Sequence, residues 1–177
     1  SVSTIIKHTN PCGLGVDTDQ PTAYRRALEG DPVSAYGGIV GFNRTVTLET
    51  AKAMRGVLFH VIVAPGYQEG VLQVFKNRKQ LRVLQVSPTT GRTMDVEVRK
   101  VSGGALLQTL DQIDEDPGSW QIVTNRNPTR DEFKDLTLGW KVIKHIRSNT
   151  IVLTRDNTMV GMGAGQPNRV TSVHLAL

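Results

Sequence analysis

The feature that most constrains the fold is an alternation of short apolar segments with segments of helical periodicity. We expect strands at residues 4–7, 38–42, 57–63, 81–86, 94–101 and 120–124. Helices are expected at residues 21–28, 48–54, 69–77 and 130–147, and from near Asn168 onward. Residues 150–153 and 159–162 have the pattern of a hairpin around Asp156 and Asn157. This alternation predicts an α/β protein with a mostly parallel sheet, to which the hairpin adds an antiparallel component.

Composition limits the class of protein. The 177 residues are 38% hydrophobic and 21% charged, which is typical of one globular domain or two small ones. No apolar run approaches the roughly 20 residues that span a bilayer, and no signal-peptide pattern opens the chain, so we expect no membrane partner. The single cysteine, Cys12, excludes an internal disulfide framework and a multi-thiolate zinc site. With one cysteine, a reducing, cytoplasmic compartment is the expected location.

The net charge of +5 indicates an anionic partner. Because the basic residues are scattered, a phosphate-bearing small molecule explains the charge as well as nucleic acid does, and we expect no nucleic-acid partner. Both ends of the chain interrupt apolar segments, residues 4–6 and 170–177, without a stop signal. We therefore expect a fragment of a longer protein.

Polar residues directly follow the first expected strand, in the motif KHTNPCG at residues 7–13. Lys7 supplies a positive charge for an oxyanion, and His8 can accept a proton near neutral pH. Neighbouring strand residues point to opposite faces, so the pair can cooperate only if the chain bends between them. Pro11 and Gly13 predict a loop through residue 15. The alternative is a strand end with two solvated polar residues.

Three later segments carry weaker signals. Gly37 is the first of paired glycines, which allow a positive φ or close backbone approach, although a simple turn explains them too. Asn149 offers an amide that suits a carboxamide ligand, or else a helix C-cap. Residues 161–169 form a glycine-rich turn before a helix whose first turn holds Arg169, an arrangement that favours phosphate binding. Residues 62–67 are expected to leave the sheet at the same edge as Lys7.

Taken in order, these motifs resemble the transformylase domain of the bifunctional purine biosynthesis enzymes that make IMP. The matching segments are IIKHTNPCGLG, DPVSAYGGIVGFNR, VIVAPGY, VSGGALLQ, WKVIKHIRSNTIVL and VGMGAGQPNRVTSVHLA. The resemblance covers nearly the whole chain. It implies a cytidine-deaminase-like three-layer α/β/α fold with a mixed sheet. Residues 1–177 would then be one partial transformylase domain, or a first part at 1–86 and a second part at 87–177.

The resemblance also implies an activity. Members transfer a formyl group from the cosubstrate 10-formyltetrahydrofolate to AICAR ribotide, without a metal and as homodimers. Lys7 and His8 match the catalytic pair. The substrate-binding positions are Asn10, Gly37, His60, Asn149, Gln166 and Arg169. His60 departs from the family pattern, in which an acidic residue is expected at that position.

Two other classes of protein compete with this interpretation. A zinc deaminase would share the fold, but it needs His-x-Glu followed by Pro-Cys-x-x-Cys, and the second cysteine does not exist here. A non-catalytic binding or assembly module would explain why family segments upstream and downstream are missing. The retained Lys7, His8, Asn149 and Arg169 argue against such a module.

Overall fold

The computed structural model describes residues 1–87, 96–111 and 115–177. Its contacts divide the chain into two compact units, Ser1–Ser87 with Pro128–Leu177 and, separately, Pro88–Asn127. The expected start of a strand at residues 94–95 lies outside the described residues.

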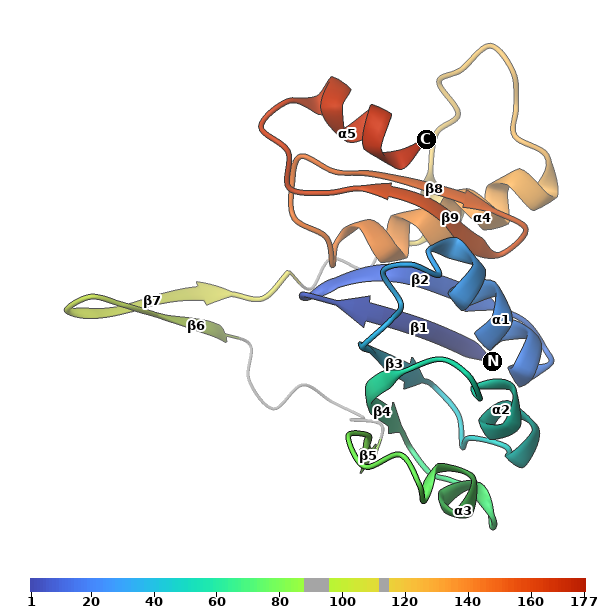
Figure 1. Ribbon diagram of the computed structural model, residues 1–177. Helices are drawn as coiled ribbons and strands as arrows, with labels where there is room; N and C mark the ends of the chain where they lie inside the picture. Colours follow the sequence, from blue (N-terminus) through green and yellow to red (C-terminus); the bar gives the residue numbers. More distant parts are fainter. Residues whose placement is uncertain (88–95, 112–114) are drawn as a thin grey trace. The chain divides into compact units, whose positions relative to one another are not determined.

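The larger unit is built on one mixed sheet (Figure 1). Among the described residues seven strands pair in the order β5-β4-β3-β1-β2-β9-β8. They are β1 Val2–Lys7, β2 Asn10–Val16, β3 Gly38–Phe42, β4 Phe59–Ala64, β5 Arg82–Gln85, β8 Ile151–Arg155 and β9 Thr158–Gly163. The pairs β3–β4 and β4–β5 are parallel, and the other four are antiparallel. The predicted α/β class with a mixed sheet is confirmed, but the expectation of a mostly parallel sheet is wrong.

The error originates at β2, which we expected to be a loop. Residues 10–16 form a full strand that pairs with both β1 and β9, despite Pro11, Gly13 and Gly15. The two glycines are needed because helix α1 (Gln20–Gly30) lies directly on the strand. A Cβ atom added to Gly13 would lie 1.8 Å from the Ala27 carbonyl oxygen, and one added to Gly15 would lie 2.4 Å from that of Ala23.

Helices cover both faces of the sheet. On one face, α1 packs with α2 (Leu48–Ala53) and α3 (Val71–Phe75) around a core that contains Ile5, Tyr24 and Phe59. Gly161 and Gly163 of β9 pack against the backbone of α5 (Arg169–Ala176). Leu14 alternates with Gly13 and Gly15 and therefore points to the opposite face. There it joins the cluster of Val142, Ile146 and Met159 with α4 (Arg130–Ile143), which completes a three-layer α/β/α arrangement.

The helix limits follow their capping residues. Asp19, Thr47 and Asn168 accept hydrogen bonds from backbone amides in the first turns of α1, α2 and α5. Thr129 and Glu132 form the expected capping box of α4. This helix ends at Ile143, four residues before the predicted end.

The smaller unit contains a two-stranded hairpin of β6 (Val96–Val101) and β7 (Gly104–Thr109), followed by the short 3₁₀ helix η1 (Pro117–Ser119). The prediction of a strand that ends at Val101 is confirmed, whereas β7 was not anticipated. The strand expected at residues 120–124 does not form.

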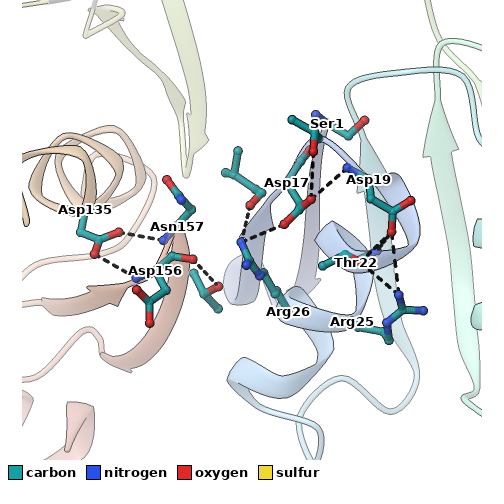
Figure 2. A network of polar contacts seen from close by, with 12 residues as sticks. Ser1, Asp17, Asp19, Thr22, Arg25, Arg26, Asp135, Asp156 and Asn157 are labelled. Atoms are coloured by element: carbon teal, nitrogen blue, oxygen red, sulfur yellow. Dashed lines mark hydrogen bonds and ion pairs between the residues drawn. The ribbon is translucent and has the colours of Figure 1, made fainter. Parts of the chain in front are cut away.

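A polar network at one edge of the sheet links β2 to the β8–β9 hairpin (Figure 2). The hairpin turns at Asp156 and Asn157, both with positive φ, as the sequence predicted. The Asp135 carboxylate accepts hydrogen bonds from both of their backbone amides, at 2.9 and 2.8 Å. Val16 donates its backbone N–H to the Asn157 carbonyl at 2.9 Å, and Arg26 donates to the Val16 carbonyl. This network holds the register between β2 and β9 and so fixes the opposite ends of both strands.

Candidate functional site

The predicted site residues collect at the other edge of the sheet. Strand β1 ends there at Lys7, and β2 begins there at Asn10. Because β3 is antiparallel to β1 and parallel to β4, both β3 and β4 begin at this edge too. Strand β9 is antiparallel to β2, so its last residue, Gly163, also lies there. Segments distant in sequence therefore meet along one row of strand ends (Figure 1).

Lys7, His8 and Asn10 belong to the β1–β2 hairpin. Lys7 pairs with Asn10, and the two-residue turn between them consists of His8 and Thr9. Both turn residues adopt positive φ, 50° and 69°. Positive φ is uncommon for histidine and strained for a β-branched threonine, and such strain concentrates at functional sites. The expected bend after Lys7 is therefore present, and the His8 side chain is exposed.

Gly37 brings Lys7 and His60 together. The Lys7 ammonium donates a hydrogen bond to the Tyr36 carbonyl oxygen. Gly37 adopts φ +72°, and its N–H donates to the Leu58 carbonyl at 2.8 Å. A Cβ atom added to Gly37 would lie 3.4 Å from Nζ of Lys7 and 3.4 Å from Cε1 of His60. The positive φ that paired glycines allow is confirmed, whereas the distances at Gly37 are those of ordinary contact in a simple turn before β3.

Asn149, Gln166 and Arg169 form a second group. The backbones of Asn149 and Gln166 exchange two hydrogen bonds of 3.2 Å. Nδ2 of Asn149 donates to the carbonyls of Gln166 and Pro167, at 3.0 and 3.2 Å. Both amide hydrogens thus hold the loop before α5, and only Oδ1 is left to accept from a ligand. Asn149 is not a helix C-cap, because α4 ends earlier.

Arg169 is the first residue of α5, and its side chain is exposed. It lies where unpaired backbone amides and the helix dipole favour an anion. Within the described parts of the chain, no hydrogen bond or ion pair involves its guanidinium group. This group is therefore available to a phosphate.

Cys12 lies inside the first motif without being reactive. Its thiol is buried and donates to the Ile5 carbonyl at 3.4 Å. Burial raises the pKa of the Cys12 thiol, and the nearby Asp31 carboxylate raises it further. The thiol stays protonated at neutral pH and acts as a packing group.

Comparison with known proteins identifies the family. The family model described as AICARFT/IMPCHase bienzyme matches residues 1–177. The chain belongs to this family. A bifunctional purine biosynthesis protein of Dictyostelium discoideum is 46% identical over 98% of this chain and 34% of its own length. Similar proteins from Trichodesmium erythraeum and Bacillus cereus are 44% and 43% identical over 98% and 97% of this chain. The chain spans about a third of the length of these relatives.

One expectation about the candidate site is wrong. Residues 62–67 leave β4 at its carboxyl end, which lies at the edge opposite Lys7, because β4 runs antiparallel to β1. Sequence reasoning also missed the Tyr36 carbonyl as the partner of Lys7. No sequence signal could have revealed it, because every residue carries a backbone carbonyl.

In residues 1–87, 96–111 and 115–177, no group of three or more His, Cys, Asp or Glu side chains is arranged to hold a metal ion. No helix in those ranges is both long and apolar enough to cross a membrane.

Proposed function

We propose that this chain carries part of a phosphoribosylaminoimidazolecarboxamide formyltransferase site. There a formyl group passes from 10-formyltetrahydrofolate to the amine of AICAR ribotide in purine biosynthesis. The observation that carries the proposal is the convergence of Lys7, His8, Gly37, Asn149 and Arg169 at one edge of the sheet. The naming of the relatives as purine biosynthesis proteins supports an enzyme over a non-catalytic module.

The hairpin side chains suit acyl transfer. An amine conjugated to a carboxamide is a poor nucleophile, so its attack on the formyl carbon requires a base. His8 takes the amine proton from its exposed position in the turn. Lys7 stabilises the negative charge that develops on the formyl oxygen, or protonates the departing folate nitrogen. The Tyr36 carbonyl orients the Lys7 ammonium and leaves two of its three N–H donors for this task.

The second group suits the rest of the ribotide. Arg169 and the first turn of α5 bind the phosphate, and Oδ1 of Asn149 accepts from the ligand. Strands β1 and β9 are separated by β2, so the ends of these two strands, from which the two groups extend, lie about 10 Å apart along the edge. A ligand with a phosphate at one end and a reactive amine at the other fits this spacing. Asn10 and Gln166 complete the binding residues at the neighbouring strand ends.

The remaining features of the whole protein are part of the same proposal. We place it in the cytoplasm, as a homodimer, with residues 1–177 as a partial transformylase domain. Analytical ultracentrifugation of the chain tests the dimer directly, because a sedimentation mass of one chain at micromolar concentration contradicts it.

Calorimetric titration of the chain with AICAR ribotide tests the site. We expect saturable binding that Arg169→Ala weakens about tenfold to hundredfold, since a hydrogen bond to a charged group contributes about 1.5–3 kcal/mol. Arg155→Ala is the matched control, because Arg155 is equally exposed but lies at the end of β8, at the opposite edge. The riboside, which lacks the phosphate, should bind wild type and Arg169→Ala equally. Ribotide binding unaffected by Arg169→Ala, or no binding at all, overturns the proposed site.

A further inference from the structure

The orientation of the Lys7 ammonium depends on one backbone carbonyl. Lys7 donates to the Tyr36 carbonyl oxygen, and no other hydrogen bond or ion pair of this ammonium forms within residues 1–87, 96–111 and 115–177. Tyr36 lies in the turn of residues 32–37, between α1 and β3, and its own side chain is exposed. Whatever fixes this turn therefore also fixes the direction of the Lys7 side chain.

The peptide group between Tyr36 and Gly37 is held on both sides. The N–H of Gly37 donates to the Leu58 carbonyl at 2.8 Å. Because a trans peptide group is planar, the Tyr36 carbonyl of the same group points away from Leu58, and there it meets Lys7. A rotation of this peptide group would break both hydrogen bonds at once.

Asp31 holds the first half of the turn. Its Oδ1 atom accepts a hydrogen bond from the Ser34 backbone N–H at 2.9 Å, and its carbonyl accepts from the Ala35 N–H at 3.1 Å. Ala35 is buried in the core, whereas Pro32 and Val33 are exposed. Because packing contributes little at these two exposed residues, the path of the chain from α1 to Ala35 depends on the hydrogen bonds to Asp31.

The charge of Asp31 also acts close to Lys7. Burial is the main cause of the raised pKa of the Cys12 thiol, the Asp31 carboxylate raises this pKa further, and the Lys7 ammonium lowers it. Both charges therefore act on the same buried thiol of β2, the strand that pairs with the strand of Lys7. This supports a location of Asp31 beside the β1–β2 hairpin, as the hydrogen bonds of the turn require.

We propose that Asp31 is a positioning residue for Lys7: its carboxylate caps the turn of residues 32–37 and so directs the Tyr36 carbonyl that orients the ammonium. The inference rests on the proposed function for what Lys7 does to the formyl oxygen, whereas the positioning belongs to the chain without a ligand. The role requires the Oδ1 acceptor, which an amide also supplies, and not the negative charge.

Four variants separate the hydrogen bond from the charge and from general stability. Asp31→Ala removes the acceptor. Asp31→Asn keeps it without the charge, since asparagine caps as well as aspartate does. Asp31→Glu keeps the charge but moves it one methylene group away from the capping position. Asp19→Ala is the matched control, because the Asp19 carboxylate accepts from the Thr22 N–H at 3.0 Å and caps the other end of α1.

The experiment follows the two Cε protons of Lys7 by NMR, assigned by their absence in Lys7→Arg. A side chain held in one orientation gives two distinct proton signals, and one that changes rotamer rapidly gives an averaged signal. We expect distinct signals in wild type, Asp31→Asn and Asp19→Ala, and an averaged signal in Asp31→Ala and Asp31→Glu. An averaged signal in wild type or in Asp19→Ala, or distinct signals in Asp31→Glu and not in Asp31→Asn, overturns the inference.

Turnover of the complete protein separates this inference from the proposed function. Asp31→Ala should lower kcat about tenfold, as expected for one impaired hydrogen bond from a charged group, and leave the KM for the ribotide unchanged. Asp31→Asn should restore kcat. An averaged Lys7 signal in Asp31→Ala with wild-type turnover supports the positioning and overturns the role of Lys7 in formyl transfer. Distinct Lys7 signals in Asp31→Ala overturn the positioning and leave the proposed function standing.

Discussion

Gly13→Ala tests whether β2 depends on direct contact with helix α1. The added Cβ atom would lie 1.8 Å from the Ala27 carbonyl oxygen and 2.9 Å from its carbonyl carbon. The obstructing atoms belong to the helix backbone, so no side-chain rotation relieves the clash. The helix must move away by more than an ångström. Gly15 and Gly30 mark equally tight contacts of this helix, because Cβ atoms added to them would lie 2.4 Å from the Ala23 carbonyl oxygen and 2.6 Å from that of Met159.

The expected cost follows from two opposing effects. Overpacking of a core costs about 1–3 kcal/mol, and a clash with rigid backbone belongs at the upper end. Replacing glycine in a strand interior recovers about 0.5–1 kcal/mol of conformational entropy. We therefore expect a net destabilisation of about 2 kcal/mol. With a urea m-value of about 2 kcal/mol/M, the unfolding midpoint should fall by about 1 M.

Urea unfolding followed by circular dichroism measures this effect. Gly104→Ala is the matched control, because it is the same substitution in a strand, with nothing within 4 Å of the new Cβ. Its midpoint should stay near that of wild type. If Gly13→Ala also unfolds within 0.3 M, about 0.5 kcal/mol, of wild type, the argument from close approach is wrong.

Three further predictions concern the far edge, the core and the hairpin. Asp135→Ala should lower the free energy of unfolding by about 1–2 kcal/mol, because two turn amides lose a charged acceptor. Asp131→Ala is the control and should change the free energy of unfolding little. Equal effects of the two substitutions in urea melts would contradict this prediction. Burial raises the pKa of Tyr24 to about 12, above the value near 10 of an unfolded chain. The contribution of the neutral Tyr24 hydroxyl to the free energy of unfolding is therefore complete below pH 10 and falls by about 2 kcal/mol towards pH 12. Thermal melts of Tyr24→Phe should show a smaller loss of stability between about pH 10 and pH 12 than those of wild type. If stability depends on pH equally in both proteins, Tyr24 is not the group responsible. His8→Ala should abolish formyl transfer in the complete protein yet leave ribotide affinity largely intact, so wild-type turnover would exclude His8 as the base.

Local signals predicted the helices and the turns well. The helix starts expected at residues 21, 48 and 130 lie within one residue of the observed ones, and Asp156-Asn157 marked the hairpin turn, because capping and turn chemistry involve neighbouring residues only. The same rules failed at β2. The glycines of that strand reflect the approach of helix residues eight to fourteen positions away, which no local pattern encodes.

The direction of the strands was the second property that the sequence did not reveal. The residues of β4 are apolar in either orientation, so the sequence could not tell that residues 62–67 leave at the edge opposite Lys7. The direction of the later strands relative to β1 is decided by the two-residue turn at His8 and Thr9, because this turn makes β1 and β2 antiparallel. The candidate residues were named individually from a family resemblance, whereas their common edge is a property of the topology.

This topology also explains why the polar network and the candidate site lie at opposite ends of the same strands. Asp135, Asn157 and Arg26 hold β9 against β2 at one edge, and Asn10 and Gly163 end the same two strands at the other. A shift of β9 by one residue would turn every side chain of that strand to the other face of the sheet. The loop of Gln166, which follows β9 and is hydrogen-bonded to Asn149, would then move relative to Lys7. Residues at the far edge therefore determine whether the groups proposed to bind phosphate and to transfer the formyl group keep their separation.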